Sequence, residues 1–186
     1  MFWLLADSNI VFIGVVLGVP VLALIFMYNG HVSRRNAVDY AFSSIDVQLK
    51  KRWDLILRLV ETAKGYAKHE KEMFERVTVA RTLAQTAHGA ERFRREGEVS
   101  QELPNLIALA ESYPELKADA QFINLQHNLT EIESQISAAR RAYNAAITEY
   151  NDGVHMFPSS LVAGMFGFKK REWFQIEASE EGVKHV

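Results

Sequence analysis

The chain has 186 residues, which leaves about one domain of material beside a membrane segment, since domains usually have about 100 to 150 residues. Its 21 basic and 23 acidic residues give a formal charge of −2 and are interleaved, which argues against the concentrated positive face that nucleic acid requires. The absence of cysteine excludes disulfides, thiolate metal sites and a thiol nucleophile.

The N-terminal part contains one long apolar run. Residues 10–28 read IVFIGVVLGVPVLALIFMY without a charged side chain, close to the ~20 residues that cross a hydrocarbon core of about 30 Å. A secretory signal peptide is the rival interpretation, but it begins with positive charge and ends in a small-x-small cleavage site. Here Asp7 precedes the run and Met-Tyr-Asn stands at its end. The run therefore predicts an uncleaved transmembrane helix.

The charges beside this helix predict its orientation. No Lys or Arg precedes it, whereas Arg34 and Arg35 follow closely, so the positive-inside rule places residues 1–9 outside and the remaining chain in the cytoplasm. Gly14 and Gly18 form a small-xxx-small pair, a spacing that lets two helix backbones approach closely. They are the candidate residues for self-association, although glycine is common in membrane helices and a chance pair is the alternative.

An amphipathic helix is predicted next, from about Val32 to Lys64, with Gly65 interrupting it. Its apolar positions follow steps of three and four: Val38, Phe42, Ile45, Leu49, Ile56, Leu59, Ala63 and Tyr66. Arg52 is the exception, and we expect its neighbour Trp53 to cover that position. Polar residues near the start of this helix are candidates for either a buried polar network or a binding surface: Asn36, Ser43, Asp46 and Gln48.

The middle of the chain predicts two shorter helices. The first covers about residues 73–87, after a turn in which His69 is solvated or caps a helix. The mixed-charge run 91–98 reads as a solvated loop. A short helix then covers Leu103 to Ser112, with Pro104 in its first turn, where a missing N–H is harmless, and ends before Pro114.

The last long helix is predicted from about Glu115 to Asn151, a length of over 50 Å at ~1.5 Å per residue. Its apolar seam contains no polar member: Phe122, Leu125, Leu129, Ile132, Ile136, Ala139, Tyr143, Ala146 and Tyr150. No strand-like alternation occurs in the sequence. The predicted fold class is therefore all-α: one N-terminal transmembrane helix at 10–28, then an up-down-up-down antiparallel helical bundle at 31–152.

Such a bundle returns the chain to the bilayer, and the composition of residues 153–186 fits that position. Three basic side chains stand among aromatic and aliphatic ones there, as expected at an anionic headgroup surface. With Arg34 and Arg35, the predicted membrane interface comprises Phe157, Phe166, Phe168, Lys169, Lys170, Arg171, Trp173 and Phe174. The alternative is that these aromatics fold back on the bundle end, or on the first long helix near Tyr40 and Phe42.

Several short motifs, in order along the chain, resemble the LemA family. They are Arg34-Arg35-Asn36, the run from Ala41 to Lys50, Lys64-Gly65-Tyr66-Ala67, Tyr113-Pro114-Glu115-Leu116-Lys117-Ala118, Tyr143-Asn144, Tyr150-Asn151, Phe157-Pro158 and Gly167-Phe168. The resemblance implies a single-pass protein of the bacterial inner membrane with a helical bundle and no assigned activity. It also implies relatives in magnetosome membranes, and gene neighbours encoding membrane peptidases or TPM-domain proteins. The bulky N-terminus Met1-Phe2-Trp3-Leu4-Leu5 departs from the family pattern.

None of the catalytic motifs that we considered occurs in the sequence. A di-metal bundle site needs Glu-x-x-His, a pattern absent from this sequence. His69-Glu70 lacks the second histidine of a zinc protease, and no Gly-x-Ser-x-Gly or glycine-rich phosphate loop occurs. We therefore predict no enzyme, no catalytic or metal-binding residue, no cofactor and no small-molecule substrate.

These observations favour a membrane-anchored scaffold or adaptor that self-associates and organises membrane or envelope proteins. The alternative is a regulator or substrate adaptor of a membrane peptidase. A third interpretation, a metal-dependent bundle enzyme, lacks its ligands. The expected partners are the lipid bilayer, further copies of the chain, and a membrane peptidase or TPM-domain protein.

Overall fold

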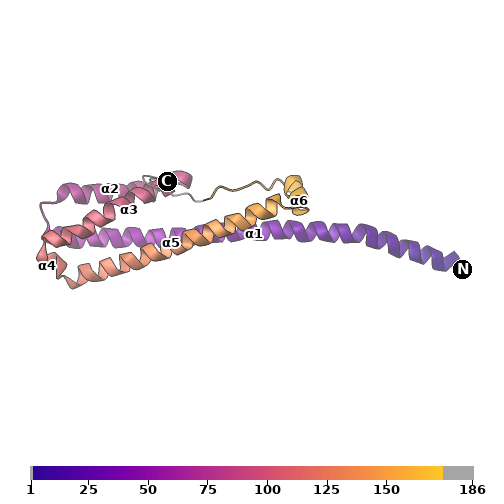
Figure 1. Ribbon diagram of the computed structural model, residues 1–186, viewed down its shortest axis with the longest axis horizontal. Helices are drawn as coiled ribbons and strands as arrows, with labels where there is room; N and C mark the ends of the chain where they lie inside the picture. The colour runs from indigo at the N-terminus through magenta and orange to yellow at the C-terminus, as the bar shows by residue number, and fades with distance from the viewer. Residues whose placement is uncertain (1, 174–186) are drawn as a thin grey trace, which may run out of the picture. The chain divides into compact units, whose positions relative to one another are not determined.

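A computed structural model describes residues 2–173, with side chains described from Gly14 onward except at position 90. This part of the chain is helical without strands, as the sequence predicts (Figure 1). Its helices are α1 (Phe2–Tyr66), α2 (Lys71–Thr86), α3 (Gly89–Ser112), α4 (Pro114–Lys117), α5 (Ala120–His155) and α6 (Ser159–Phe166).

The chain forms two compact units. The anchor unit contains residues 1–42 and 142–173, and the described part of the bundle unit is Ser43–Arg141. The long helices α1 and α5 contribute to both units, whereas α2, α3 and α4 belong to the bundle unit and α6 to the anchor unit.

Helix α1 is longer than either of the two helices predicted for its residues. The apolar run and the following amphipathic stretch form one continuous helix, because Gly30 alone does not break a helix and no proline stands near the junction. The helix ends at Tyr66, next to Gly65. A turn follows, in which His69 is exposed, as predicted for a solvated residue.

The prediction of a solvated loop at residues 91–98 is wrong. These residues belong to α3, which begins at Gly89, so Pro104 lies inside this helix and not in its first turn. The charges stabilise the helix locally: Glu91 accepts hydrogen bonds from Arg94 at 2.6 Å and from Arg95 at 2.8 Å. Ion pairs between residues three and four positions apart stabilise a helix, so a mixed-charge run does not by itself indicate a loop.

The last predicted helix is divided near its start. Helix α4 ends at Lys117, and α5 begins after Asp119, whose Oδ1 accepts the backbone N–H of Phe122 at 2.8 Å. This hydrogen bond holds the pKa of Asp119 below its usual value, and the Tyr66 hydroxyl donates to the other carboxylate oxygen at 2.8 Å. Asp119 therefore caps α5 and ties its start to the end of α1.

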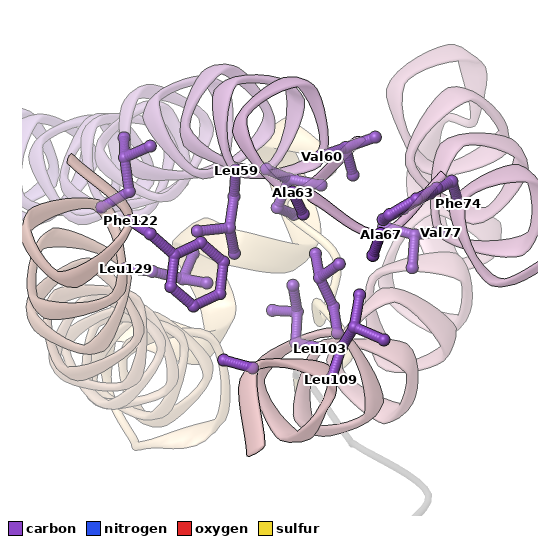
Figure 2. Packing of buried hydrophobic residues seen from close by; sticks show 14 of the residues in the cluster. Leu59, Val60, Ala63, Ala67, Phe74, Val77, Leu103, Leu109, Phe122 and Leu129 are labelled. Carbon is purple, nitrogen blue, oxygen red and sulfur yellow. The ribbon is translucent and has the colours of Figure 1, made fainter. Parts of the chain in front are cut away.

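The hydrophobic core of the bundle unit lies between α1, α2, α3 and α5 (Figure 2). Its buried side chains include Leu59, Ala63, Phe74, Val77, Leu103, Leu109, Phe122 and Leu129. The predicted seam of α5 enters this core with Phe122, Leu125 and Leu129, and Ile132 and Ile136 are buried further along the helix. Each large apolar side chain contributes about 1.5–3 kcal/mol on burial, so this layer is the main source of the unit's stability.

Candidate membrane-interface site

The apolar run of α1 is exposed along the part whose side chains the structure describes. Gly14–Tyr66 is the one helix among the described residues that is long and apolar enough to cross a membrane. Its most apolar window has a mean hydropathy of 1.8 and is 6% buried, and Phe26 is 76% exposed. A core helix of a soluble protein would be buried, so hydrocarbon is the medium that suits this surface.

Helix α6 packs beside α1 at the end of this run. The Phe166 ring lies 4.8 Å from the ring of Tyr28, the last residue of the run, and the Nε2–H of His31 donates to the Ser159 carbonyl at 3.0 Å. Gly167 has a φ of +72°, a conformation that glycine adopts without strain, and it ends α6. These contacts hold α6 next to the C-terminal end of the apolar run.

The outward side of α6 is apolar. Val162 and Ala163 are each 1% exposed and form its buried side. Large apolar side chains cover the opposite side and the approach to the helix: Met156, Phe157, Leu161, Met165 and Phe166, with Phe157 81% exposed. Exposed apolar side chains gathered in this way are typical of a surface that meets a membrane or another protein.

A basic segment follows α6 and lies along α5. The side chains of Lys169 and Lys170 are exposed. Arg171 is held firmly: its backbone N–H donates to Asn151 Oδ1 at 2.9 Å, Asn151 Nδ2 donates back to the Arg171 carbonyl at 2.9 Å, and its guanidinium contacts Asp39 at 2.5 Å. The chain after α6 is therefore tied to both α5 and α1.

Further predicted interface residues meet in the anchor unit. Phe168 stacks on the buried ring of His31, with a centroid distance of 5.0 Å, and Arg35 lies 5.8 Å from the Phe168 centroid. Arg34 lies against Gly153, where a Cβ would come within 3.1 Å of its Nη1. Trp173 Nε1 donates to Thr148 Oγ1 at 3.0 Å.

The alternative that these residues fold back on the protein applies to only some of them. Phe168, Arg171 and Trp173 fold back on α1 or α5, whereas Phe157 and the two lysines face outward. Phe174 lies outside the described residues. Gly14 and Gly18 have open space around them, since a Cβ at either position would meet no atom within 4 Å.

The four polar residues singled out on the first amphipathic helix do not lie in one place. Asn36 is exposed in the anchor unit. Ser43 is exposed, Asp46 pairs with Arg92 at 2.9 Å, and Gln48 is half-buried; all three belong to the bundle unit. The four residues are therefore divided between the two units and do not form one network or surface.

A buried polar network surrounds Arg52 instead, the charged residue that interrupts the apolar positions of the first amphipathic stretch. Arg52 and Glu96 are both 0% exposed and form an ion pair. Arg52 also donates to Glu133 at 2.9 Å and to Ser100 at 3.0 Å, and Trp53 Nε1 donates to Glu96 Oε1 at 2.9 Å. Trp53 therefore helps to hold the partner of Arg52, and the network joins α1, α3 and α5.

Burial raises the pKa of Glu96 above its usual value, and the charge and hydrogen bonds of Arg52 offset that shift only in part. The sequence indicates that Arg52 has a buried acidic partner, because this arginine interrupts an otherwise apolar seam. It does not indicate which residue that partner is, because Glu96 stands in a run of charged residues that includes other glutamates.

The continuous helices and the exposed apolar surfaces define a membrane-associated, all-helical protein. The chain belongs to the LemA family, whose model matches residues 41–186. This match confirms the resemblance.

Individual relatives agree with this membership. The chain is 24% identical to magnetosome protein MamQ 2 of Paramagnetospirillum magneticum, over 83% of this chain and 67% of the relative. It is 20% identical to magnetosome protein MamQ of Magnetospirillum gryphiswaldense, over 83% and 66%. Protein LemA of Metamycoplasma hominis is 23% identical, over 74% and 66%. The chain spans about two thirds of the length of these relatives.

Proposed function

We propose that this protein is a non-catalytic, membrane-anchored helical scaffold that self-associates and organises membrane or envelope proteins, with α6 as a second contact to the bilayer. The observation that carries this proposal is the position of α6. It packs beside α1 at Tyr28 and turns its apolar side outward.

The depth of α6 in the membrane follows from its contact with Tyr28. Tyrosine at the end of an apolar run sits at the headgroup level, so a helix packed on it lies at the same level. The exposed apolar side chains then enter the boundary of the acyl chains, while Lys169 and Lys170 remain among anionic headgroups. Two contacts at this level restrict the tilt of the anchor more than one helix does.

The same geometry supports a cytoplasmic bundle. Arg34 and Arg35 lie on the same side of the apolar run as the two lysines that follow α6. Positive residues concentrate on the cytoplasmic side of membrane proteins. The two MamQ relatives are named for an organelle, the magnetosome, which supports an organising role.

Lipid contact at α6 is tested by a tryptophan at Phe157, the most exposed large apolar side chain of the surface that leads into this helix. Phe157→Trp in a background of Trp3→Phe and Trp173→Phe leaves Trp53, which is 4% exposed, as the second emitter. We expect lipids brominated at shallow depth to quench the added emission, because the side chain lies at the acyl boundary. The background protein without Phe157→Trp is the matched control, since the protein itself shields Trp53. Quenching of the added tryptophan by aqueous acrylamide alone would exclude this second contact.

Self-association is tested at the glycine pair. Gly14→Leu with Gly18→Leu should reduce the size of oligomers in detergent, measured by light scattering, because the larger side chains keep two helices apart. The substitutions fit within one protomer, since no atom lies within 4 Å of a Cβ at either position. Val15→Leu with Val19→Leu is the matched control at the same spacing. Unchanged oligomers in the glycine variant would contradict a glycine-mediated contact.

A further inference from the structure

A groove in the bundle unit is not used by the membrane contact. It has a volume of about 810 Å³ and lies between the end of α1, the turn after it and α2. Phe74, a buried core residue, and Val79, which is 48% exposed, contribute apolar surface to it. Thr78 donates its hydroxyl to the Phe74 carbonyl at 2.7 Å, so this donor is satisfied within α2. The inner surface of the groove therefore suits an apolar side chain.

The border of the groove is basic. Lys64, Lys68 and Lys71 line it and are exposed, whereas Glu75 is the single carboxylate among the lining residues. With a neutral His69, the formal charge of the lining is +2. A partner of opposite charge is attracted to such a border, and a partner of like charge is rejected.

The ammonium groups of this border are available to a partner. In the part of the chain that the structure describes, the three lysines form no ion pair. The carboxylates on either side of Lys71 in the sequence are engaged elsewhere: Glu70 accepts a hydrogen bond from the Tyr113 hydroxyl at 3.2 Å, and Glu72 pairs with Arg76 at 3.4 Å. The bundle unit thus leaves the positive charge at the groove without a neutralising carboxylate.

The bilayer that holds the anchor does not supply the missing negative charge. From Tyr28, the end of the apolar run, to Lys64, the continuous helix α1 rises by about 54 Å at ~1.5 Å per residue. Exposed charges further apart than a Debye length of about 8 Å are largely screened at physiological ionic strength. Anionic headgroups of that membrane are therefore not the occupant of the groove.

A second copy of the chain does not offer its acid-rich stretch 91–98 either. Glu91 and Glu98 pair with arginines of their own helix. Glu96 is buried and pairs with Arg52. The carboxylates of this stretch are already neutralised within one copy, which favours a different protein as the partner.

We propose that the groove binds an acidic segment of another protein, a peptide in which an aliphatic or aromatic side chain stands among carboxylates. The apolar side chain lies on the inner surface of the groove, against Phe74 and Val79, and the carboxylates meet the three lysines of the border. This binding does not depend on α6 or on contact between copies, so it and the proposed function can fail separately.

The class of partner is tested by selection from a phage-displayed library of random peptides on the full chain in nonionic detergent. A parallel selection uses the variant Lys64→Glu, Lys68→Glu and Lys71→Glu. We expect peptides that prefer the unsubstituted chain to combine an excess of carboxylates with an aliphatic or aromatic side chain. The proposal is overturned if no peptides distinguish the two proteins, or if those that do are not acidic or carry no apolar side chain.

Charge recognition is then measured by the fluorescence anisotropy of a selected peptide labelled with fluorescein. The triple lysine variant should bind it about tenfold more weakly, and Glu75→Lys about threefold more tightly, because exposed charges each contribute modestly. Reversal of three exposed lysines that do not line the groove, Lys50, Lys51 and Lys117, is the matched control and should leave the affinity within about twofold. Equal losses in the groove and control variants, or weaker binding by Glu75→Lys, would show that the lysines of the groove do not recognise the peptide.

The apolar part of the contact is tested at Val79. Val79→Ser should weaken binding of the same peptide about fivefold, because the half-exposed side chain loses apolar surface that the peptide covers. Ile123→Ser is the matched control on α5, at a side chain that is 49% exposed and does not line the groove. Unchanged binding by Val79→Ser would overturn the proposed position of the apolar side chain and with it the proposal.

Discussion

Replacing Glu96 by Ala is expected to lower the free energy of unfolding by about 3 kcal/mol. The substitution leaves the fully buried guanidinium of Arg52 without its main partner. Breaking a buried pair in this way typically costs about 3–5 kcal/mol. We expect the low end because Glu133 and Ser100 still accept hydrogen bonds from the guanidinium.

The measurement is urea unfolding of the full chain in detergent, followed by tryptophan fluorescence. Glu98→Ala is the matched control two residues further along α3. Its ion pairs with Arg94 and Arg95 are largely solvated, so the expected loss is below about 1 kcal/mol. Equal losses at the two positions would show that Arg52 does not depend on Glu96.

A double substitution separates the ion pair from the packing around it. Arg52→Met with Glu96→Leu replaces the pair by apolar side chains and should recover most of the stability that Glu96→Ala loses. This is expected because burial already opposes ionisation of Glu96 and raises its pKa. Recovery would indicate that the pair aligns α1 with α3 more than it stabilises the bundle.

Phe122→Ala is expected to destabilise the protein by about 3–5 kcal/mol, because it leaves a cavity where a fully buried ring joins α5 to the core of the bundle unit (Figure 2). The same urea unfolding measures the change. Ile123→Ala at the next position is the matched control, and since that side chain is 49% exposed it should cost less than about 1 kcal/mol. Similar losses would mean that the predicted face of α5 is not the packed one.

The sequence by itself determined the helical class, the apolar run of α1 and the buried seam of α5. These follow from periodicity and length, which are local properties of the chain. Phe122, Leu129 and Ile136 are buried because a helix brings residues at this spacing to one side. The sequence does not indicate whether the apolar run and the amphipathic stretch form one helix or two, because no residue at their junction favours either a break or a continuation.

Only the tertiary structure decided the state of residues 91–98 and the side of α6 that faces outward. A mixed-charge stretch has the same composition in a loop and on a helix surface. Glu96 is buried because it pairs with Arg52, 44 residues earlier in the chain, whereas Glu98 pairs with Arg95 of its own helix. Likewise, Phe166 and Phe168 are equally aromatic in sequence. Phe168 is half-buried against His31, whereas Phe166 stays exposed, because α6 ends at Gly167 and the chain turns there toward α5. Burial depends on which surfaces meet, and distant segments of the chain supply those surfaces.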